Sequence, residues 1–262
     1  MRVLYIGQSG DDVRAWQVFL RGLIPTSVIE SSGVFDDTTK AETRGFQRAS
    51  GVTSDGVVGP LTLSKALAVG FNPLSDDRTS ENSSSWPAPP AFGPMSAHDR
   101  QTIFGVFSYI SAPVPGNPEA IQITNGWATS NIVYPVIPQF ANVSGAPGSG
   151  KVPFHAVAVP QFIKLWADWE QAGLLPRILT WGGSWVPRFV RGSRVYLSNH
   201  SWGTAFDINV QWNMLGSMPA LKGQKGSIRE LVEIANDNGF YWGGHFGGRP
   251  DGMHFEVAKV MP

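Results

Sequence analysis

The segment over residues 72–95 constrains the fold most, because it contains few apolar side chains that could pack into a hydrophobic core. It reads NPLSDDRTSENSSSWPAPPAFGPM, is dense in Ser, Asp, Asn and Pro, and shows no apolar periodicity. Such a segment predicts a linker, so the chain must bury its apolar side chains in two separate parts. We therefore expect a small N-terminal domain over residues 1–71 and a larger C-terminal domain over residues 96–262.

The bulk composition narrows the classes of partner. Of the 262 residues, 42% are hydrophobic and 15% are charged, which favours a folded core over disorder. The formal net charge of zero argues against nucleic acid as the main partner. The absence of cysteine excludes disulfides and thiolate metal sites. No apolar run approaches the about 18 residues of a membrane span, and we expect a monomer.

Three helical patterns follow one another in the N-terminal domain. In SGDDVRAWQVFLRGL, Ser9 is placed to cap a helix with Trp16 on its inner face. In FDDTTKAETRGFQRASG, Asp36 or Asp37 can cap the second helix. In DGVVGPLTLSKAL, Pro60 stands in the first turn of the third. The patterns predict a small three-helix bundle.

These three stretches resemble the three-helix type of peptidoglycan-binding domain. The resemblance covers residues 5–67 and includes Gln17, the pair Phe46-Gln47 and the ending around Gly59-Pro60. It implies binding to the glycan or the stem peptide of the bacterial cell wall. A generic helical adaptor is the alternative.

The C-terminal domain mixes helical and strand patterns. Ser96 and Asp99 are placed to open a helix that continues through residue 110, and residues 159–173 form an amphipathic helical pattern. The stretches TAFDINV and MHFEV alternate as strands do. We expect an α+β domain with an antiparallel sheet.

Two of these strands present polar side chains. Strand periodicity puts Asp207 on the face opposite Phe206 and Ile208. His200 precedes this strand, and a turn at Gly203 would let its imidazole converge with the Asp207 carboxylate.

The second strand carries His254 and Glu256 on one face. If it lies beside the Asp207 strand, then His200, Asp207 and His254 form a three-ligand set. Two imidazoles and one carboxylate suit Zn²⁺, which in catalytic sites keeps a fourth position for water. Glu256 is either a solvent-facing residue or, as we prefer, a partner that orients a ligand.

A hydrolytic zinc site also needs a base and a group that stabilises negative charge. Asp251 stands three residues before His254 and is a candidate base, although an Asp-Gly pair is also a common turn. Arg188 and Arg191, just upstream of the first ligand segment, are candidates for stabilising an oxyanion.

The motifs SNHSWGTAFDIN, GFYWGGHF and DGMHFEV together resemble the zinc D,D-peptidase family that includes VanY-type carboxypeptidases and several phage endolysins. The resemblance implies that His200, Asp207 and His254 are zinc ligands and that Asp251 is the catalytic acid/base. Asp251 stands where many members have Glu, which shortens the reach of the carboxyl group by one methylene.

The same resemblance assigns further roles. Ser198 matches a serine that can contact substrate, and Arg188 is the best match to an upstream arginine. Trp242 and His245 are predicted to contact the substrate. The resemblance covers residues 177–257, and residues 96–176 form an extension that compact members lack.

These features predict a two-domain enzyme that binds peptidoglycan and hydrolyses an amide of its stem peptide. Three bonds remain open: L-Ala to D-Glu, D-Ala to diaminopimelate in a cross-link, and a terminal D-Ala. One rival is a glycosidase that uses Asp207 and Glu256 as its carboxylate pair. Another is a non-catalytic wall-binding protein with a structural zinc.

The first residues, MRVLYIGQSGDDV, lack the apolar stretch of a signal peptide. We therefore expect a phage endolysin that is made in the host cytoplasm and acts on the cell wall after release.

Overall fold

The computed structural model describes residues 2–24, 27–30, 32–69, 71, 86–247 and 249–261. Contacts divide the chain into two compact units. Unit 1 comprises Met1–Pro87, Asn209–Glu230 and Phe246–Met253, and unit 2 comprises Ala88–Ile208, Leu231–His245 and His254–Pro262. Residues 72–85 of the expected linker lie outside the described residues, and residues 86–95 contain neither helix nor strand. The domain bounds 1–71, 72–95 and 96–262 stay a prediction.

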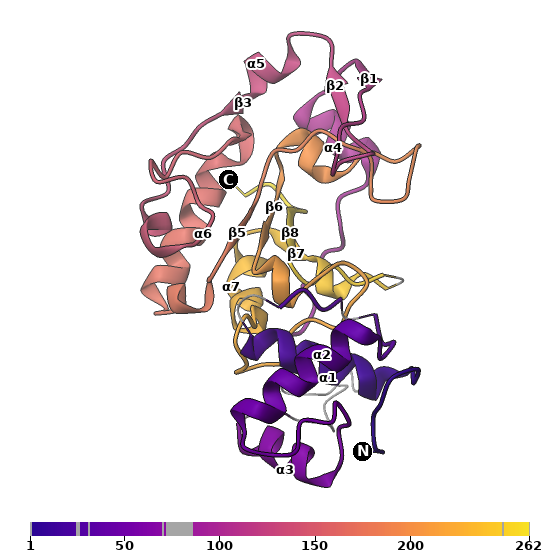
Figure 1. The fold of residues 1–262 in the computed structure, drawn as a ribbon. Coiled ribbons are helices and arrows are strands. Elements are labelled where there is room, and N and C mark those ends of the chain that lie inside the picture. The colour runs from indigo at the N-terminus through magenta and orange to yellow at the C-terminus, as the bar shows by residue number, and fades with distance from the viewer. Residues whose placement is uncertain are drawn as a thin grey trace. The chain divides into compact units, whose positions relative to one another are not determined.

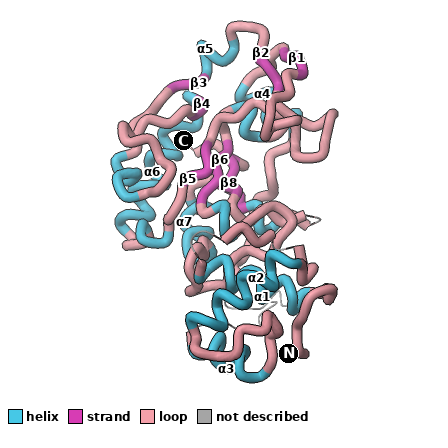
Figure 2. Tube along the Cα trace, in the orientation of Figure 1, coloured by secondary structure: helices cyan, strands magenta, loops and turns pink. Residues whose placement is uncertain are grey.

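The described residues form helices and short antiparallel strands (Figures 1 and 2). The helices are α1 (Asp11–Leu23), α2 (Asp37–Ala49), α3 (Pro60–Ala68), α4 (Ala97–Phe104), α5 (Trp127–Asn131), α6 (Val159–Gln171) and α7 (Val232–Asp237). The strands are β1 (Tyr109–Ser111), β2 (Ile121–Ile123), β3 (Ile132–Val133), β4 (Phe154–His155), β5 (Trp181–Gly183), β6 (Ala205–Ile208), β7 (Phe240–Trp242) and β8 (His254–Val257). The prediction of an α+β fold with an N-terminal helical bundle is confirmed.

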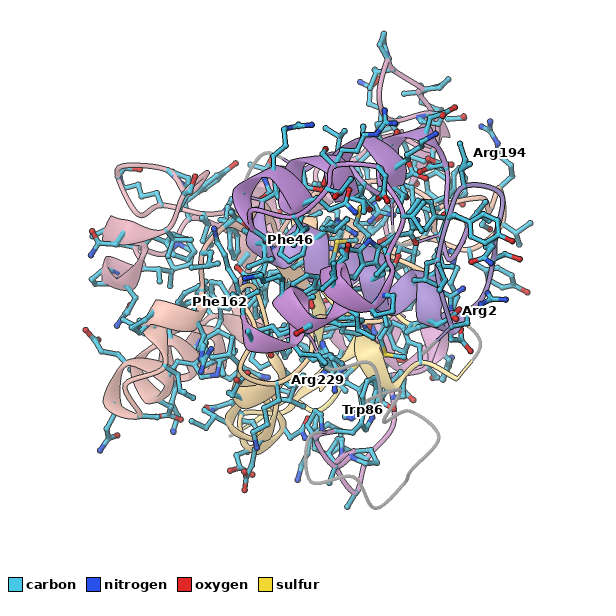
Figure 3. All side chains as sticks on the ribbon, turned by 60° about the horizontal axis from the view of Figure 1, so that its bottom comes forward. Arg2, Phe46, Trp86, Phe162, Arg194 and Arg229 are labelled. Atoms are coloured by element: carbon cyan, nitrogen blue, oxygen red, sulfur yellow. The ribbon has the colours of Figure 1, made fainter. Side chains whose placement is uncertain are left out.

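An aromatic cluster holds the three helices of unit 1 together. Trp16 of α1 packs edge-on against Phe46 of α2, with ring centroids 5.6 Å apart, and against Phe71 at 5.4 Å. The Trp16 indole N–H donates to Thr43 Oγ1 at 2.9 Å, so its one polar atom is paired inside the core. In the same unit, the guanidinium of Arg229 lies over the ring of Trp86 at 4.7 Å (Figure 3).

The helix starts agree only in part with the sequence. Asp36, one of the two predicted caps, accepts a hydrogen bond from the Thr39 N–H at 2.7 Å, and Pro60 is in the first turn of α3. The predicted Ser9 cap is wrong, because α1 is preceded by Gly10, which gives no side-chain cap. Gly10 has φ +146°, a conformation that a residue with a Cβ rarely adopts.

The largest sheet of unit 2 has the strand order β5-β6-β8-β7, with antiparallel neighbours throughout. Helix α6 packs on one face of this sheet through aromatic rings (Figure 1). Phe206 of β6 stacks on Phe255 of β8 at 5.4 Å and on Trp181 of β5 at 5.9 Å, and it contacts Phe162 of α6 at 5.4 Å. This aromatic layer fixes the strands that carry the candidate site.

Helix α4 is shorter than the sequence indicates. The Ser96 hydroxyl caps it by accepting from the Asp99 N–H at 3.0 Å, as expected. The helix ends at Phe104, and Tyr109 begins a strand, so the expected continuation through residue 110 is wrong. Gly105 stops the helix: its φ is +85°, and a Cβ there would lie 2.8 Å from Nε1 of Trp127.

None of the helices in the described part of the chain has the length and hydropathy needed to span a bilayer.

We predict that Phe206→Ala lowers the free energy of unfolding by about 3–5 kcal/mol, because it opens a cavity in the aromatic layer. Urea unfolding followed by tryptophan fluorescence measures this. Tyr134→Ala, which removes an aromatic ring that is 57% exposed, is the matched control and should change stability little. A similar small change for both variants would contradict this description of the core.

Candidate metal centre

The pairing of β6 with β8 places two carboxylates and one imidazole on one face of the sheet. In the antiparallel register Asp207 lies opposite His254, and Ala205 lies opposite Glu256. Because side chains alternate along a strand, Asp207, His254 and Glu256 all project to the side away from Phe206 and Phe255.

His200 reaches the same place from a tight turn. It lies on the short 3₁₀ helix η5 (Asn199–Trp202), which ends at Gly203 in the left-handed region with φ 65°. A Cβ at Gly203 would lie 2.8 Å from Cδ1 of Ile132 and 3.2 Å from the backbone nitrogen of His155. The His155 N–H also donates to the Gly203 carbonyl at 2.9 Å. The turn is therefore closely packed against the preceding part of unit 2.

Three donor atoms meet at this face. His200 Nε2 is 3.2 Å from His254 Nδ1 and 3.2 Å from Asp207 Oδ1, and His254 Nδ1 is 3.1 Å from Asp207 Oδ1. The sequence prediction that these three side chains converge is met by the geometry. Their role as metal ligands stays a prediction.

Each imidazole has one nitrogen that points away from the cluster, and the hydrogen bond at this outer nitrogen determines whether the inner nitrogen offers a lone pair. His200 Nδ1 lies 2.6 Å from the Ser184 carbonyl oxygen, and His254 Nε2 lies 3.0 Å from Glu256 Oε2. Both partners only accept hydrogen bonds when Glu256 is ionised, so these nitrogens carry the proton in the neutral rings. The inner atoms are then two nitrogen lone pairs and a carboxylate oxygen, an arrangement that needs a cation between them or protons on the rings.

This donor set fits zinc. Zn²⁺ binds histidine nitrogen and carboxylate oxygen at about 2.0–2.2 Å, so neighbouring ligands of a tetrahedral site stand about 3.3 Å apart. The three observed separations, 3.1–3.2 Å, are close to that value without rearrangement. Imidazole whose second nitrogen donates to a carbonyl or carboxylate is the common form of a histidine zinc ligand.

The sequence analysis named Glu256 as the partner of a ligand but missed the buried polar residues that hold it. Glu256, 2% exposed, accepts from Asn199 Nδ2 and lies 3.5 Å from the guanidinium of Arg100, which is 1% exposed. Arg100 also donates to Thr204 Oγ1 at 2.9 Å. One signal was available: Arg100 precedes Phe104 by one helical turn, so an arginine shares a face with a buried phenylalanine.

The network sets the charge state of the acids. Burial alone raises the pKa of the Asp207 carboxyl, but His200 and His254 outweigh this and hold it well below its usual range. Burial likewise raises the pKa of Glu256, and the contacts with His254, Arg100 and Asn199 bring it below its usual value. Burial lowers the pKa of Arg100, which Glu256 opposes. Both carboxyls are thus ionised in the folded protein.

The structure places the two candidate arginines differently. Arg191 pairs with Glu119 at 2.6 Å and with the Asn117 side chain at 3.0 Å. Arg188 donates its backbone N–H to Ser201 Oγ at 2.9 Å, and its guanidinium donates to the Phe189 carbonyl at 3.2 Å. Ser198 is buried at the start of the η5 turn. Stabilisation of an oxyanion by Arg188 and substrate contact by Ser198 stay predictions.

The remaining candidates lie at the ends of β7 and β8. Trp242 is fully buried, and a Cβ on Gly244 would lie 2.3 Å from its ring. His245 packs beside Trp242, with ring centroids 5.1 Å apart. Asp251 belongs to unit 1, which in this stretch ends at Met253, and unit 2 resumes at His254. Substrate contact by Trp242 and His245 and acid/base catalysis by Asp251 stay predictions.

Comparison with known proteins identifies two segments. Residues 191–257 match a family described as D-alanyl-D-alanine carboxypeptidase, and residues 9–65 match a family of peptidoglycan binding domains. A search of curated proteins found no match. The first segment contains the three converging residues but neither Arg188 nor Arg100. Together the matches support a hydrolase that acts on peptidoglycan, with a peptidase segment in its C-terminal part.

We predict that Glu256→Gln weakens zinc binding by about 10- to 100-fold, because the partner that orients His254 loses its charge. Competition with a chromogenic chelator measures the affinity. Glu233→Gln, at an exposed position on α7, is the matched control and should bind zinc as the wild type does. Equal affinities for all three proteins would show that Glu256 does not support the site.

A second prediction concerns the metal-free protein in acid. The ordinary pKa values of Asp207 and Glu256 are 3.8 and 4.5, and folding lowers both. The unfolded chain therefore binds more protons in this range, and the stability that the carboxylates provide is lost as pH falls below about 4.5. The difference in unfolding free energy between wild type and Glu256→Gln should shrink from about pH 7 to about pH 3. A difference that is independent of pH in urea unfolding would refute the lowered pKa of Glu256.

Proposed function

We propose that the protein is a zinc peptidase that hydrolyses an amide bond of the peptidoglycan stem peptide. The observation that carries this proposal is the convergence of His200, Asp207 and His254, whose donor atoms are close to the ligand spacing of zinc. The segment match to D-alanyl-D-alanine carboxypeptidases supports the same chemistry. Cleavage next to a D-alanine is accordingly the first bond to test.

In this proposal His200, Asp207 and His254 hold the metal. When bound, zinc supplies Lewis acidity, which lowers the pKa of water to about 7 and polarises an amide carbonyl. Glu256 accepts a hydrogen bond from the Nε2–H of His254 and so keeps Nδ1 available as a ligand. Arg100 and Asn199 hold Glu256 in place.

Asp251 is the proposed acid/base, which accepts a proton from water and returns it to the leaving amine. Its support is its place in the sequence, three residues before His254. The Met253 N–H donates to the Asn213 carbonyl at 3.0 Å, and a Cβ on Gly252 would lie 2.6 Å from Cγ of Pro219. Arg188 is the proposed group that stabilises the oxyanion.

The N-terminal domain is proposed to hold the enzyme on the wall. The match over residues 9–65 supports this role. Attachment raises the local substrate concentration without new contacts at the active site. The pairing of a wall-binding and a peptidase segment in one chain also suits a phage endolysin that lyses its host after release, and lysis of permeabilised bacteria by the purified protein tests this.

We predict that the zinc-loaded protein releases peptide fragments from purified sacculi and that Asp251→Asn lowers this rate by about 10²- to 10⁴-fold, the usual contribution of a general base. Mass spectrometry of the products identifies the bond. Asp237→Asn, at an exposed position at the end of α7, is the matched control and should retain full activity.

Two outcomes would contradict the proposal. Release of reducing sugar ends with intact stem peptides would indicate a glycosidase. Digestion that is unaffected by Asp251→Asn would remove Asp251 from the mechanism.

A further inference from the structure

A pocket of about 300 Å³ lies in unit 2 next to the candidate metal centre. Its walls come from α4 with the residues that flank it, and from the chain between Val195 and Trp202. Asn199 lines the pocket, directly precedes His200 and donates to Glu256. The pocket and the metal centre therefore share a wall.

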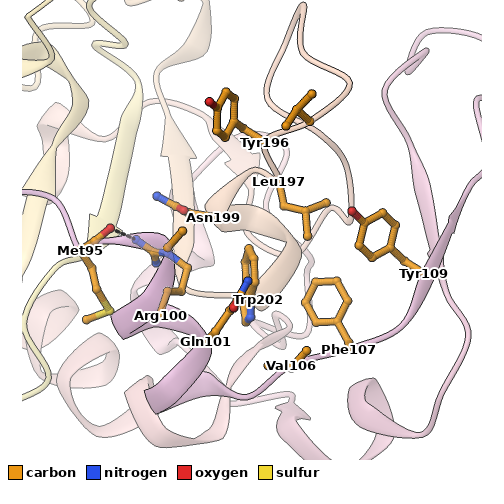
Figure 4. A pocket seen from close by; sticks show the side chains of 12 residues that line it. Met95, Arg100, Gln101, Val106, Phe107, Tyr109, Tyr196, Leu197, Asn199 and Trp202 are labelled. Carbon is orange, nitrogen blue, oxygen red and sulfur yellow. Dashed lines mark hydrogen bonds between the residues drawn. The ribbon is translucent and has the colours of Figure 1, made fainter.

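The lining divides into a polar and an aromatic side (Figure 4). Arg100 and Asn199 lie on one side, and Phe107 and Tyr109 lie on the other. Tyr196 is 72% exposed and projects beside the pocket (Figure 4). The aromatic side is fixed from behind, because Phe107 packs on Trp202 at 5.0 Å and Tyr109 packs on Phe189 at 5.8 Å.

The charges of the lining favour a neutral ligand. Arg100 is the one charged side chain among the described residues that line the pocket, and buried Glu256 already opposes its charge. A ligand carboxylate would compete with Glu256 for Arg100, and a ligand ammonium would find no acidic side chain among these lining residues, so either would lose water at a cost. Free carboxylates and amines of a stem peptide are therefore poor occupants.

We propose that this pocket binds one N-acetylated pyranose ring of the glycan strand. The apolar C–H face of a pyranose packs on aromatic rings, and its hydroxyl and acetamido groups pair with side-chain amides such as those of Asn199 and Gln101. A volume of about 300 Å³ suits a single ring better than an oligosaccharide.

This proposal extends the proposed function, on which its catalytic consequence rests. A sugar held beside the metal centre makes the enzyme prefer a stem peptide that is still attached to the glycan. The pocket is built largely from residues 95–109, outside the segment that matches the carboxypeptidase family. The extension thus contributes to substrate selection.

Sugar binding tests the pocket independently of catalysis. A β-1,4-linked tetramer of N-acetylglucosamine is titrated into the full-length protein by isothermal calorimetry. Tyr196→Ala and Tyr109→Ala should each weaken a binding component by about tenfold, the effect of removing one aromatic anchor. Tyr134→Ala, 57% exposed and outside the pocket, is the control for any binding by the N-terminal domain and should match the wild type. Identical isotherms for all four proteins would overturn the proposal.

A kinetic comparison tests the consequence. The wild type should cleave a disaccharide-linked stem peptide with a kcat/KM about tenfold above that for the same peptide without sugar, and Tyr196→Ala should bring this ratio towards one. A wild-type ratio of one would overturn the subsite. If neither peptide is cleaved, the proposed function fails, and the sugar titration alone decides whether the pocket binds glycan.

Discussion

The register between β6 and β8 is the constraint on which the candidate site depends. Because Asp207 stands opposite His254, a carboxylate and an imidazole meet on the face away from the aromatic layer. A slip of one residue would exchange these side chains with Phe206 and Phe255 and remove both the candidate ligands and the core packing at once. The stacked rings of Phe206 and Phe255 therefore hold the site in register as well as stabilising the sheet.

The second constraint is the direction in which the imidazole protons point. The Ser184 carbonyl and the Glu256 carboxylate each accept from the outer nitrogen of one ring, so in the neutral rings the inner nitrogens carry no hydrogen. Glu256 can do this while buried because Arg100 contacts its Oε1, and Asn199 donates to Oε2, the oxygen that also contacts His254. A chain of charged and polar contacts thus connects Arg100 of α4, through Glu256 on β8, to His254.

The sequence predicts the converging residues well because strand alternation and short spacing are local properties. Asp207, His254 and Glu256 follow from two alternating strands, and the helical bundle follows from three periodic stretches. The Arg100 contact joins residues 156 positions apart in the chain, and no local pattern encodes such a pairing. The early end of α4 was missed for a similar reason, because the indole of Trp127 occupies the space beside Gly105.

Gly203 links the peptidase segment to the chain that precedes it. A Cβ at this position would collide with Ile132 and crowd the backbone of His155, and both residues lie upstream of the matched residues 191–257. The turn that aims His200 is consequently shaped by residues that a family comparison leaves out. Transplanted alone into another protein, residues 191–257 would therefore carry the three candidate metal ligands without the residues that set the direction of His200.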